Sequence, residues 1–377
     1  MKPKNTIAKG TFWGAALFYI VIAFEFAYMA SPFAAFFYSS YAPALNFFNN
    51  TPTLAWLNSF FLPHVVSETS SPIINIIDEI GAVIAIVGFV AFLVGACQVY
   101  YSKLRKQGAV TKGIYNIIRH PQYISFIVCS FGLLLMWPRY IVVIMFVIMI
   151  FAYYFLAKVE EKECTIKFGQ SYIDYKNRTN MFLPFKIRLL SKLQLPKSSI
   201  KKAISLLSMF FAVLIIGLGF AKGLETLSLN SLYAIYTNNS IDLSLSKMTD
   251  EKINNIMEIV RTDNRVAALL SDFDKETRYV NYILPTEWYE SEIPMNLFES
   301  GRAHYSPRNY DANLYKVIIT RISLRNNNNI PTARMLTNIH TREGIVEIWI
   351  DLSEQRITQI LDMPDNIRYD GIPVAIY

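Results

Sequence analysis

Long apolar runs alternate with short basic stretches over the first 222 residues of this chain. The runs cover residues 11–29, 81–101, 121–137, 140–157 and 203–221. A helix of about 20 mainly apolar residues is needed to cross a hydrocarbon core of roughly 30 Å, so the pattern predicts about five transmembrane helices. A cleaved signal peptide is the competing interpretation of the first run. A retained helix is favoured, because the run is long for a signal sequence.

Residues 31–80 have a different pattern, since they are rich in aromatic residues and interrupted by five prolines. No Lys or Arg occurs between Lys9 and Lys103. This composition is typical of a loop on the non-cytoplasmic side that is partly associated with the membrane. A further membrane segment within residues 31–66 stays open.

Basic residues concentrate on one side of the predicted helices. The amino terminus, residues 103–119 and residues 158–202 hold 3, 5 and 11 Lys and Arg, respectively. By the positive-inside rule these stretches are cytoplasmic, and five helices then leave the carboxyl-terminal region extracytoplasmic. Because the basic residues flank apolar runs, they indicate membrane topology, and we expect no nucleic-acid partner.

Residues 223–377 read as one soluble domain. They carry 15 Lys and Arg against 21 Asp and Glu, whereas residues 1–222 carry 21 against 8. A helix is predicted from Thr249-Asp250-Glu251 towards Val260, and alternating patterns predict strands at 279–284, 315–324, 345–350 and 356–361, the last two as a hairpin. The fold class is therefore a mainly α-helical multi-pass membrane domain (1–222) followed by an α+β domain with an antiparallel sheet (223–377).

The cysteines and histidines are candidate metal ligands, and an aromatic pair in residues 223–377 is a candidate binding surface. The three cysteines and four histidines show no metal-ligand spacing, so the sequence predicts no metal site. The aromatic pair Trp288-Tyr289 is read as core in preference to an exposed binding surface. The role of residues 223–377 is otherwise unassigned, and a protein or ligand partner for them is left open.

Two polar clusters flank the hairpin formed by the third and fourth apolar runs. Pro121 favours the first turn of a helix, so the third helix is predicted to begin there, directly after Arg119-His120. The fourth run is followed by Glu160-Glu161. The short turn at residues 138–139 makes the two helices antiparallel, and both clusters should meet at the cytoplasmic face.

Such a place offers charges of both signs beside lipid. The helix amino terminus and Arg119 favour an anionic group, and the paired carboxylates favour an ammonium, a sulfonium or ribose hydroxyls. A zwitterionic, ribose-bearing cofactor would fit. Taken separately, Arg119-His120 also reads as a plain membrane anchor, the acidic cluster as a solvated helix continuation, and the nearby tyrosines as interfacial aromatics.

The combined motif resembles a known family. Gly113-x-Tyr115-x-x-x-Arg119-His120-Pro121-x-Tyr123, the apolar hairpin, Glu160-Glu161, then Phe168-Gly169-x-x-Tyr172-x-x-Tyr175 and Pro184 are similar to the isoprenylcysteine carboxyl methyltransferase and phospholipid methyltransferase group, over about residues 81–185. The resemblance implies an integral membrane enzyme that uses S-adenosylmethionine and methylates a lipidic or lipid-linked acceptor. It implies catalytic roles for Arg119, His120 and Glu161, and cofactor binding by these three with Tyr115, Pro121, Tyr123, Glu160, Tyr172 and Tyr175.

Two other classes remain open. Membrane sterol reductases, which use NADPH, carry a similar Arg-His-Pro-x-Tyr motif and a segment like Cys164-Thr-Ile-Lys-Phe-Gly169. A non-catalytic membrane sensor or assembly protein, working through residues 223–377, is the third interpretation. The sequence names neither the methyl acceptor nor the oligomeric state.

Overall fold

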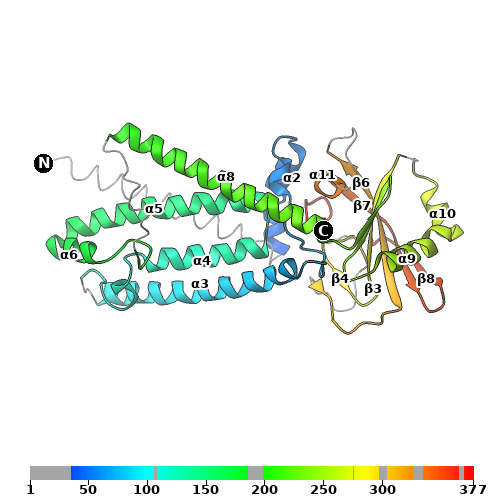
Figure 1. The fold of residues 1–377 in the computed structure, drawn as a ribbon, viewed down its shortest axis with the longest axis horizontal. Helices are drawn as coiled ribbons and strands as arrows, with labels where there is room; N and C mark the ends of the chain where they lie inside the picture. The colour runs from blue at the N-terminus through cyan, green and yellow to red at the C-terminus, as the bar shows by residue number, and fades with distance from the viewer. Residues whose placement is uncertain are drawn as a thin grey trace. The chain divides into compact units, whose positions relative to one another are not determined.

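The computed structural model describes residues 35–105, 108–185, 198–274, 276–296, 304–325, 334–364 and 369–377, without the side chains of residues 35–40 and of Lys103. The predicted first helix, 11–29, lies outside the described residues. Contacts divide the chain into two compact units (Figure 1). The helical unit contains residues 77–221, and the sheet unit combines residues 38–76 with residues 222–377.

The apolar runs that fall within the described residues all form helices. The elements are α3 (Pro72–Leu104), η3 (Gly113–Asn116), α4 (Pro121–Met136), α5 (Tyr140–Phe168), α6 (Gln170–Arg178) and α8 (Ser199–Ser231). Three stretches, Pro72–Ser102, Tyr140–Phe168 and Ser199–Ser231, are long and apolar enough to cross a membrane, and α4 is a shorter apolar helix. The helices support an integral membrane protein, as the sequence predicted.

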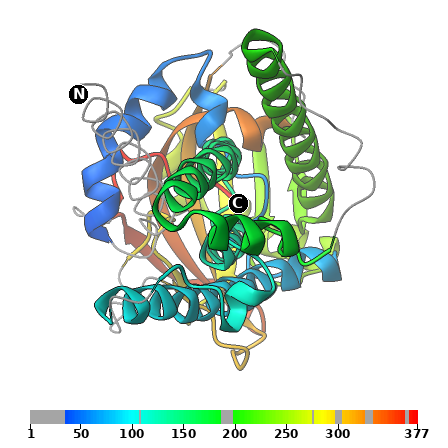
Figure 2. The same ribbon diagram turned by 90° about the vertical axis from the view of Figure 1, so that its left-hand side faces the viewer.

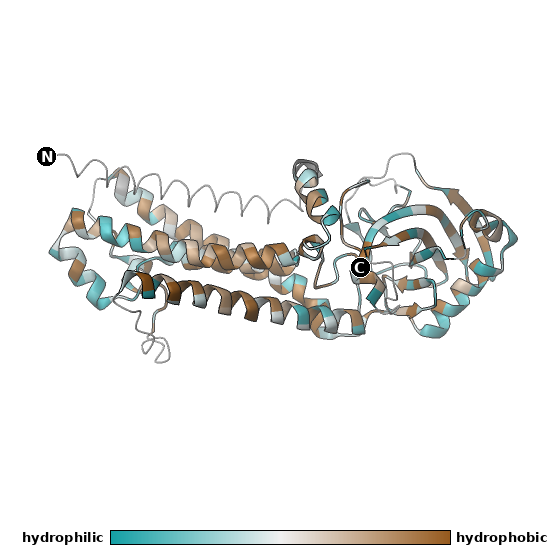
Figure 3. Ribbon diagram, turned by 90° about the horizontal axis from the view of Figure 1, so that it is seen from above, coloured by the Kyte–Doolittle hydropathy of each residue, from teal (hydrophilic) through white to brown (hydrophobic). Residues whose placement is uncertain are grey.

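Hydropathy changes along these helices. Figure 3 shows hydrophobic residues along the middle of α3 and α5 and hydrophilic residues on α6. Figure 2 views the helical unit from the end that carries α6, with α8 running obliquely beside the α4–α5 hairpin. No residue of an apolar 18-residue stretch of α8 is buried. Such a surface is suited to lipid contact.

The predicted start of α4 is confirmed, and the end of α5 lies further along the chain than predicted. His120 has non-helical backbone angles, and Pro121 occupies the first turn of α4. Helix α5 continues past Ala157 for almost three more turns, so that Glu160 and Glu161 are helical residues. It ends at Gly169, whose φ of +59° strongly favours glycine and allows α6 to fold back.

Helices α3 and α4 approach each other through small residues. A Cβ atom added at Gly88 of α3 would lie 2.7 Å from the Cα of Cys129 and 2.8 Å from the Ser125 carbonyl oxygen on α4. A Cβ added at Gly132 would lie 2.8 Å from the Cα of Ala85. These distances are below van der Waals contact, so the two helix backbones pack closely only because both positions are glycine.

A six-stranded mixed sheet forms the centre of the sheet unit. Its strand order is β1-β2-β3-β6-β7-β8, and the strands are β1 (Ala234–Tyr236), β2 (Ser240–Ser244), β3 (Arg278–Pro285), β6 (Leu314–Leu324), β7 (Ile339–Asp351) and β8 (Arg356–Asp362). The predicted strands and the β7–β8 hairpin are confirmed. The wholly antiparallel sheet was wrong, because β2 and β3 pair in parallel. A parallel pair needs a crossover, which α9 and α10 provide.

The predicted helix after residue 249 is α9 (Asp250–Thr262), followed by α10 (Asn264–Leu270). The Thr249 side chain caps α9 by accepting a hydrogen bond from the Lys252 amide. One face of α9 is buried in a core that also contains residues of β3, β6, β7 and β8. This core includes Ile253, Ile256, Val317 and Ile348.

Residues 38–76 contribute α2 (Ala35–Asn50, with its side chains described from Tyr41), η2 (Ala55–Asn58) and an extended segment to the sheet unit. The amides of His64 and Val65 donate hydrogen bonds to the Tyr377 carbonyl at 2.9 and 3.2 Å, and the Ser67 amide donates to Leu245 at 3.0 Å. The predicted loop thus carries helical turns and is bonded to the carboxyl-terminal residues.

Small elements complete the unit. A two-stranded sheet pairs β4 (Tyr289–Glu290) with β5 (His304–Tyr305), and α11 (Met335–Asn338) precedes β7. Trp288 and Tyr289 are both 3% exposed. Their reading as core residues is confirmed.

Candidate functional site in the helical unit

Backbone hydrogen bonds connect the residues just before α4 with the segment that follows α6. The Arg119 amide donates to the Asn180 carbonyl at 2.9 Å, and the His120 amide donates to the Met181 carbonyl at 3.1 Å. Ile118 and Asn180 form a parallel bridge. The segment after α6 therefore holds Arg119 and His120 in place against the last turns of α5.

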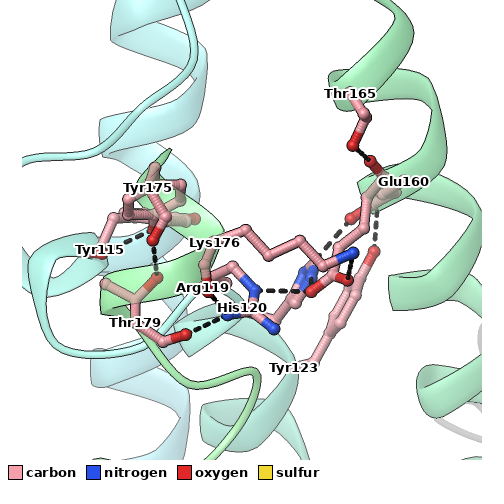
Figure 4. Close-up of polar contacts among 10 residues, drawn as sticks. Tyr115, Arg119, His120, Tyr123, Glu160, Thr165, Tyr175, Lys176 and Thr179 are labelled. Atoms are coloured by element: carbon pink, nitrogen blue, oxygen red, sulfur yellow. Dashed lines mark hydrogen bonds and ion pairs between the residues drawn. The ribbon is translucent and has the colours of Figure 1, made fainter. Parts of the chain in front are cut away.

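Arg119 and Glu161 form the centre of the site, and Figure 4 shows Arg119 close to His120 and Lys176. The Arg119 Nε donates to Glu161 Oε1 at 2.6 Å, and the Lys176 Nζ lies 3.1 Å from Glu161 Oε2. The Arg119 Nη1 also donates to the carbonyl oxygens of Lys176, at 2.9 Å, and of Thr179. Glu161 is 1% exposed. Its carboxylate is thus balanced by two cations, Arg119 just before α4 and Lys176 of α6.

His120 lies between the two adjacent glutamates. Its Nδ1 is 3.5 Å from Glu160 Oε2, and its Nε2 is 3.6 Å from Glu161 Oε1. Burial lowers the pKa of the His120 imidazole, but contacts with Glu160 and Glu161 raise it more, so that its pKa lies above the ordinary 6.5. A raised pKa means that the site favours the imidazolium form.

Glu160 is the more accessible of the two acids. Its side chain is 31% exposed, against 2% for the side chain of Glu161. The Tyr123 hydroxyl donates to Glu160 Oε1 at 2.5 Å. The Tyr123 ring stacks on His120 with an interplanar angle of 2° and on Tyr153 with centroids 4.7 Å apart. Tyr123 thus fixes the orientation of both the imidazole and the Glu160 carboxylate.

The remaining predicted tyrosines lie in the buried layer that supports this site. The Tyr175 hydroxyl donates to the Tyr115 carbonyl at 2.6 Å, and the Tyr115 hydroxyl donates to the Gln122 side chain. Tyr172 lies beside Tyr175, with ring centroids 5.7 Å apart. Burial raises the pKa of all three phenols, that of Tyr175 to about 12, so all three are neutral hydroxyls at physiological pH.

The predicted meeting of the two polar clusters is confirmed. Arg119 and His120 contact Glu160 and Glu161, with Tyr123 in the same group, and Pro121 sets the start of α4. Tyr115, Tyr172 and Tyr175 lie in the supporting layer and make none of the contacts to the two glutamates described above. Sequence reasoning missed Lys176, Thr179 and Gln122. The first two follow Tyr175 closely in the chain, which was the available signal.

Comparison with known proteins finds that the segment carrying this site is similar to a known family. Residues 80–171 match the family model of phospholipid methyltransferases. The predicted resemblance is confirmed for this segment, which contains Arg119, His120, Glu160 and Glu161. Tyr172, Tyr175 and Lys176 lie just beyond this segment. No residue of the sheet unit lies within the match.

A curated relative supports the same conclusion. The chain is 33% identical over 78 residues to protein-S-isoprenylcysteine O-methyltransferase B of Arabidopsis thaliana. The aligned part is 20% of this chain and 39% of the relative, so the chain spans about two fifths of the relative's length. No solved structure matches the chain.

Proposed function

We propose that this chain is an integral membrane methyltransferase that transfers a methyl group from S-adenosylmethionine to a lipidic or lipid-linked acceptor. The observation that carries the proposal is the cluster of Arg119, His120, Glu160 and Glu161 at one end of the α4–α5 hairpin, inside the segment that matches the family. The cofactor supplies an electrophilic methyl group when bound, and the protein positions the reactants.

The residues present fit a zwitterionic cofactor. Glu160 offers a partly exposed carboxylate, already oriented by Tyr123, which suits an ammonium or ribose hydroxyls. The first-turn amides of α4 have no acceptor within the helix, and they favour an anionic group. Lys176, whose side chain is 42% exposed, adds a cation beside Oε2 of Glu161. Both signs of charge are therefore available to a ligand.

The predicted site residues divide into two groups in this proposal. Glu160, His120 and Tyr123 would hold the cofactor. Arg119 and Glu161 neutralise each other and hold α5 against the segment after α6, so they act mainly as positioning residues. Tyr115, Tyr172 and Tyr175 support this frame from the buried side.

Proton handling depends on the acceptor. An isoprenylcysteine-like carboxylate is already a nucleophile and needs no base. A phospholipid-like amine must lose a proton, and the Glu160 carboxylate beside His120 is the proposed acceptor for it. A lipidic acceptor is supported by the apolar side chains exposed on α3, including Val83, Ile86 and Val90.

The distribution of basic residues supports a cytoplasmic amino terminus and cofactor site, with residues 223–377 on the extracytoplasmic side. Protease treatment of sealed cells tests this orientation. We expect external protease to digest residues 223–377 and to leave the α4–α5 hairpin intact. Protection of residues 223–377 in sealed cells, with digestion after permeabilisation, would contradict it.

The decisive experiment is transfer of labelled methyl from S-adenosylmethionine to total lipid and protein extracts by the purified full-length chain. We expect label in a lipid-soluble product with the wild-type protein and none with the Glu160→Gln variant. Equilibrium titrations with S-adenosylmethionine and with NADPH accompany it. Binding of NADPH alone would replace the proposal by the reductase interpretation, and binding of neither would favour a non-catalytic role.

A further inference from the structure

Two histidines and two buried glutamates gather in the sheet unit, far from the site described above in sequence. Glu290 lies in β4, Glu292 follows two residues later, and His304 lies in β5, where it pairs with Glu290 across the two strands. His64 comes from the extended segment of residues 59–70. Its amide is held by the Tyr377 carbonyl at 2.9 Å.

The distances between the nitrogen and oxygen atoms of these side chains are close to those between ligands of a single metal ion. His64 Nε2 lies 3.8 Å from Glu292 Oε1, and His304 Nε2 lies 3.5 Å from Glu292 Oε2. Both exceed the 2.7–3.2 Å typical of N–H···O hydrogen bonds. Two ligands bound tetrahedrally to one zinc ion at about 2.0–2.1 Å are separated by roughly 3.3 Å. One ligand atom from each of the three residues can be chosen so that all lie within 4.8 Å of one another.

The surrounding contacts orient these groups as metal ligands require. The Nδ1 of His304 contacts Glu290 Oε2, while its Nε2 faces Glu292. A carboxylate that accepts from Nδ1–H leaves the lone pair of Nε2 available for a metal ion, and it fixes the ring orientation. The Ser291 hydroxyl donates to Glu292 Oε2 at 2.9 Å. Two of the three candidate ligands, His304 and Glu292, are thus held by neighbours outside the ligand set.

Burial and charge favour a bound cation. Glu290 and Glu292 are 2% and 4% exposed. Among the residues that the structure describes, the ion-pair partners of both carboxylates are histidines. Arg342 donates to the backbone carbonyl of Glu292 instead of to its carboxylate. Two buried carboxylates close to each other require nearby positive charge, which one divalent ion provides.

We propose that His64, Glu292 and His304 bind a divalent first-row transition-metal ion, with Zn²⁺ as the best fit, and that Glu290 positions His304. Three protein ligands of this type leave a fourth tetrahedral position for water or another ligand. Glu292 also lines a cavity of about 700 Å³ within the sheet unit. The absence of a metal site was predicted from sequence spacing, which cannot detect ligands that distant segments bring together.

Metal titration of the full-length, tag-free protein in detergent tests the proposal. After removal of metal with a chelator, Zn²⁺ is titrated against a chromophoric indicator, and Co²⁺ is added separately to follow its visible ligand-field bands. We expect one Zn²⁺ per chain and a Co²⁺ spectrum of four-coordinate nitrogen and oxygen ligation. His64→Gln and His304→Gln should each weaken Zn²⁺ binding at least 100-fold. Glu290→Gln should weaken it about 10–100-fold, the usual effect of losing an outer-shell partner.

His340→Gln is the matched control, because His340 belongs to the same unit and its ring contacts Asn49. It should retain the wild-type affinity. Equal affinity in His64→Gln, His304→Gln and His340→Gln, or the absence of a stoichiometric Zn²⁺ complex in the wild type, would overturn the proposal and leave the cluster as a set of histidine–carboxylate ion pairs. The Co²⁺ spectrum of the wild type decides the question even if a variant does not fold.

Discussion

The Arg119 Nε lies 2.6 Å from Glu161 Oε1, although 42 residues separate the two side chains in the chain. Both side chains are largely buried, at 9% and 2% exposure. Breaking a buried ion pair by removing one partner leaves the other charge without compensation. This pair therefore links the geometry of the candidate site to the stability of the helical unit.

Glu161→Gln should destabilise the helical unit by about 3–5 kcal/mol, since the buried Arg119 loses its counterion. The variant should also bind S-adenosylmethionine at least tenfold more weakly, because α5 is no longer held against the segment after α6. Thermal unfolding in detergent and equilibrium binding measure the two effects. Glu163→Gln on the same helix is exposed and serves as the control. Wild-type affinity in Glu161→Gln would remove this residue from the site.

Tyr123→Phe removes the hydroxyl that donates to Glu160 at 2.5 Å and keeps the ring that stacks on His120. We expect at least a fivefold loss of methyl transfer, about 1 kcal/mol, because a hydrogen bond to a partly exposed carboxylate is lost. Tyr100→Phe, at a position 65% exposed on α3, should have wild-type activity. Equal activity of the two variants would show that the orientation of Glu160 is unimportant.

The raised pKa of His120 predicts a pH-dependent contribution to stability. A folded-state pKa above the unfolded value means that the stabilisation is fully present below about pH 6.5 and is lost as the pH rises through the folded-state pKa. The difference in melting temperature between wild type and His120→Gln should therefore be larger at pH 6 than at pH 9. A difference that stays constant, or grows with pH, would contradict the ion-pair role.

Gly88→Ala should weaken the packing of α3 on α4, because the added Cβ overlaps the backbone of Cys129. Forcing extra volume into a packed contact typically costs about 1–3 kcal/mol. We expect a lower melting temperature and reduced methyl transfer. Gly219→Ala on α8 is the matched control, since its added Cβ meets no atom within 4 Å apart from those of its own turn of helix. If both variants melt like the wild type, the close approach at Gly88 is not needed.

Local rules predicted the helix starts well and the helix ends poorly. Pro121 restricts the residue before it and suits a first turn, so the start of α4 could be read from sequence. The end of α5 could not, because charged residues after Ala157 resemble the end of a membrane run while the helix itself continues to Phe168. The parallel pairing of β2 with β3 was missed for a similar reason. Strand direction depends on the crossover through α9 and α10, which alternation does not encode.

The part of the candidate site that lies at the two ends of the α4–α5 hairpin could be predicted from the sequence. Arg119 and Glu161 meet because a short turn makes α4 and α5 antiparallel. Lys176 reaches Glu161 only because the chain folds back at Gly169, where φ is +59°. The rings of His64 and His304 lie with their centroids 5.4 Å apart although the two residues come from distant segments of the chain, and no periodic pattern predicts such a contact.

Helix α5 is continuous from Tyr140 to Phe168. The direction in which the site's carboxylates point is therefore fixed relative to the apolar residues earlier in the same helix. Tyr153, Ala157 and Glu161 are spaced four residues apart and are all buried, so the acid continues a stripe that begins in the apolar part of the helix. Each residue of an α-helix turns the chain by about 100°. A single residue inserted between Ala157 and Glu160 would therefore rotate both carboxylates out of register with Tyr153 and Ala157, whereas an insertion after Gly169 would leave that alignment unchanged.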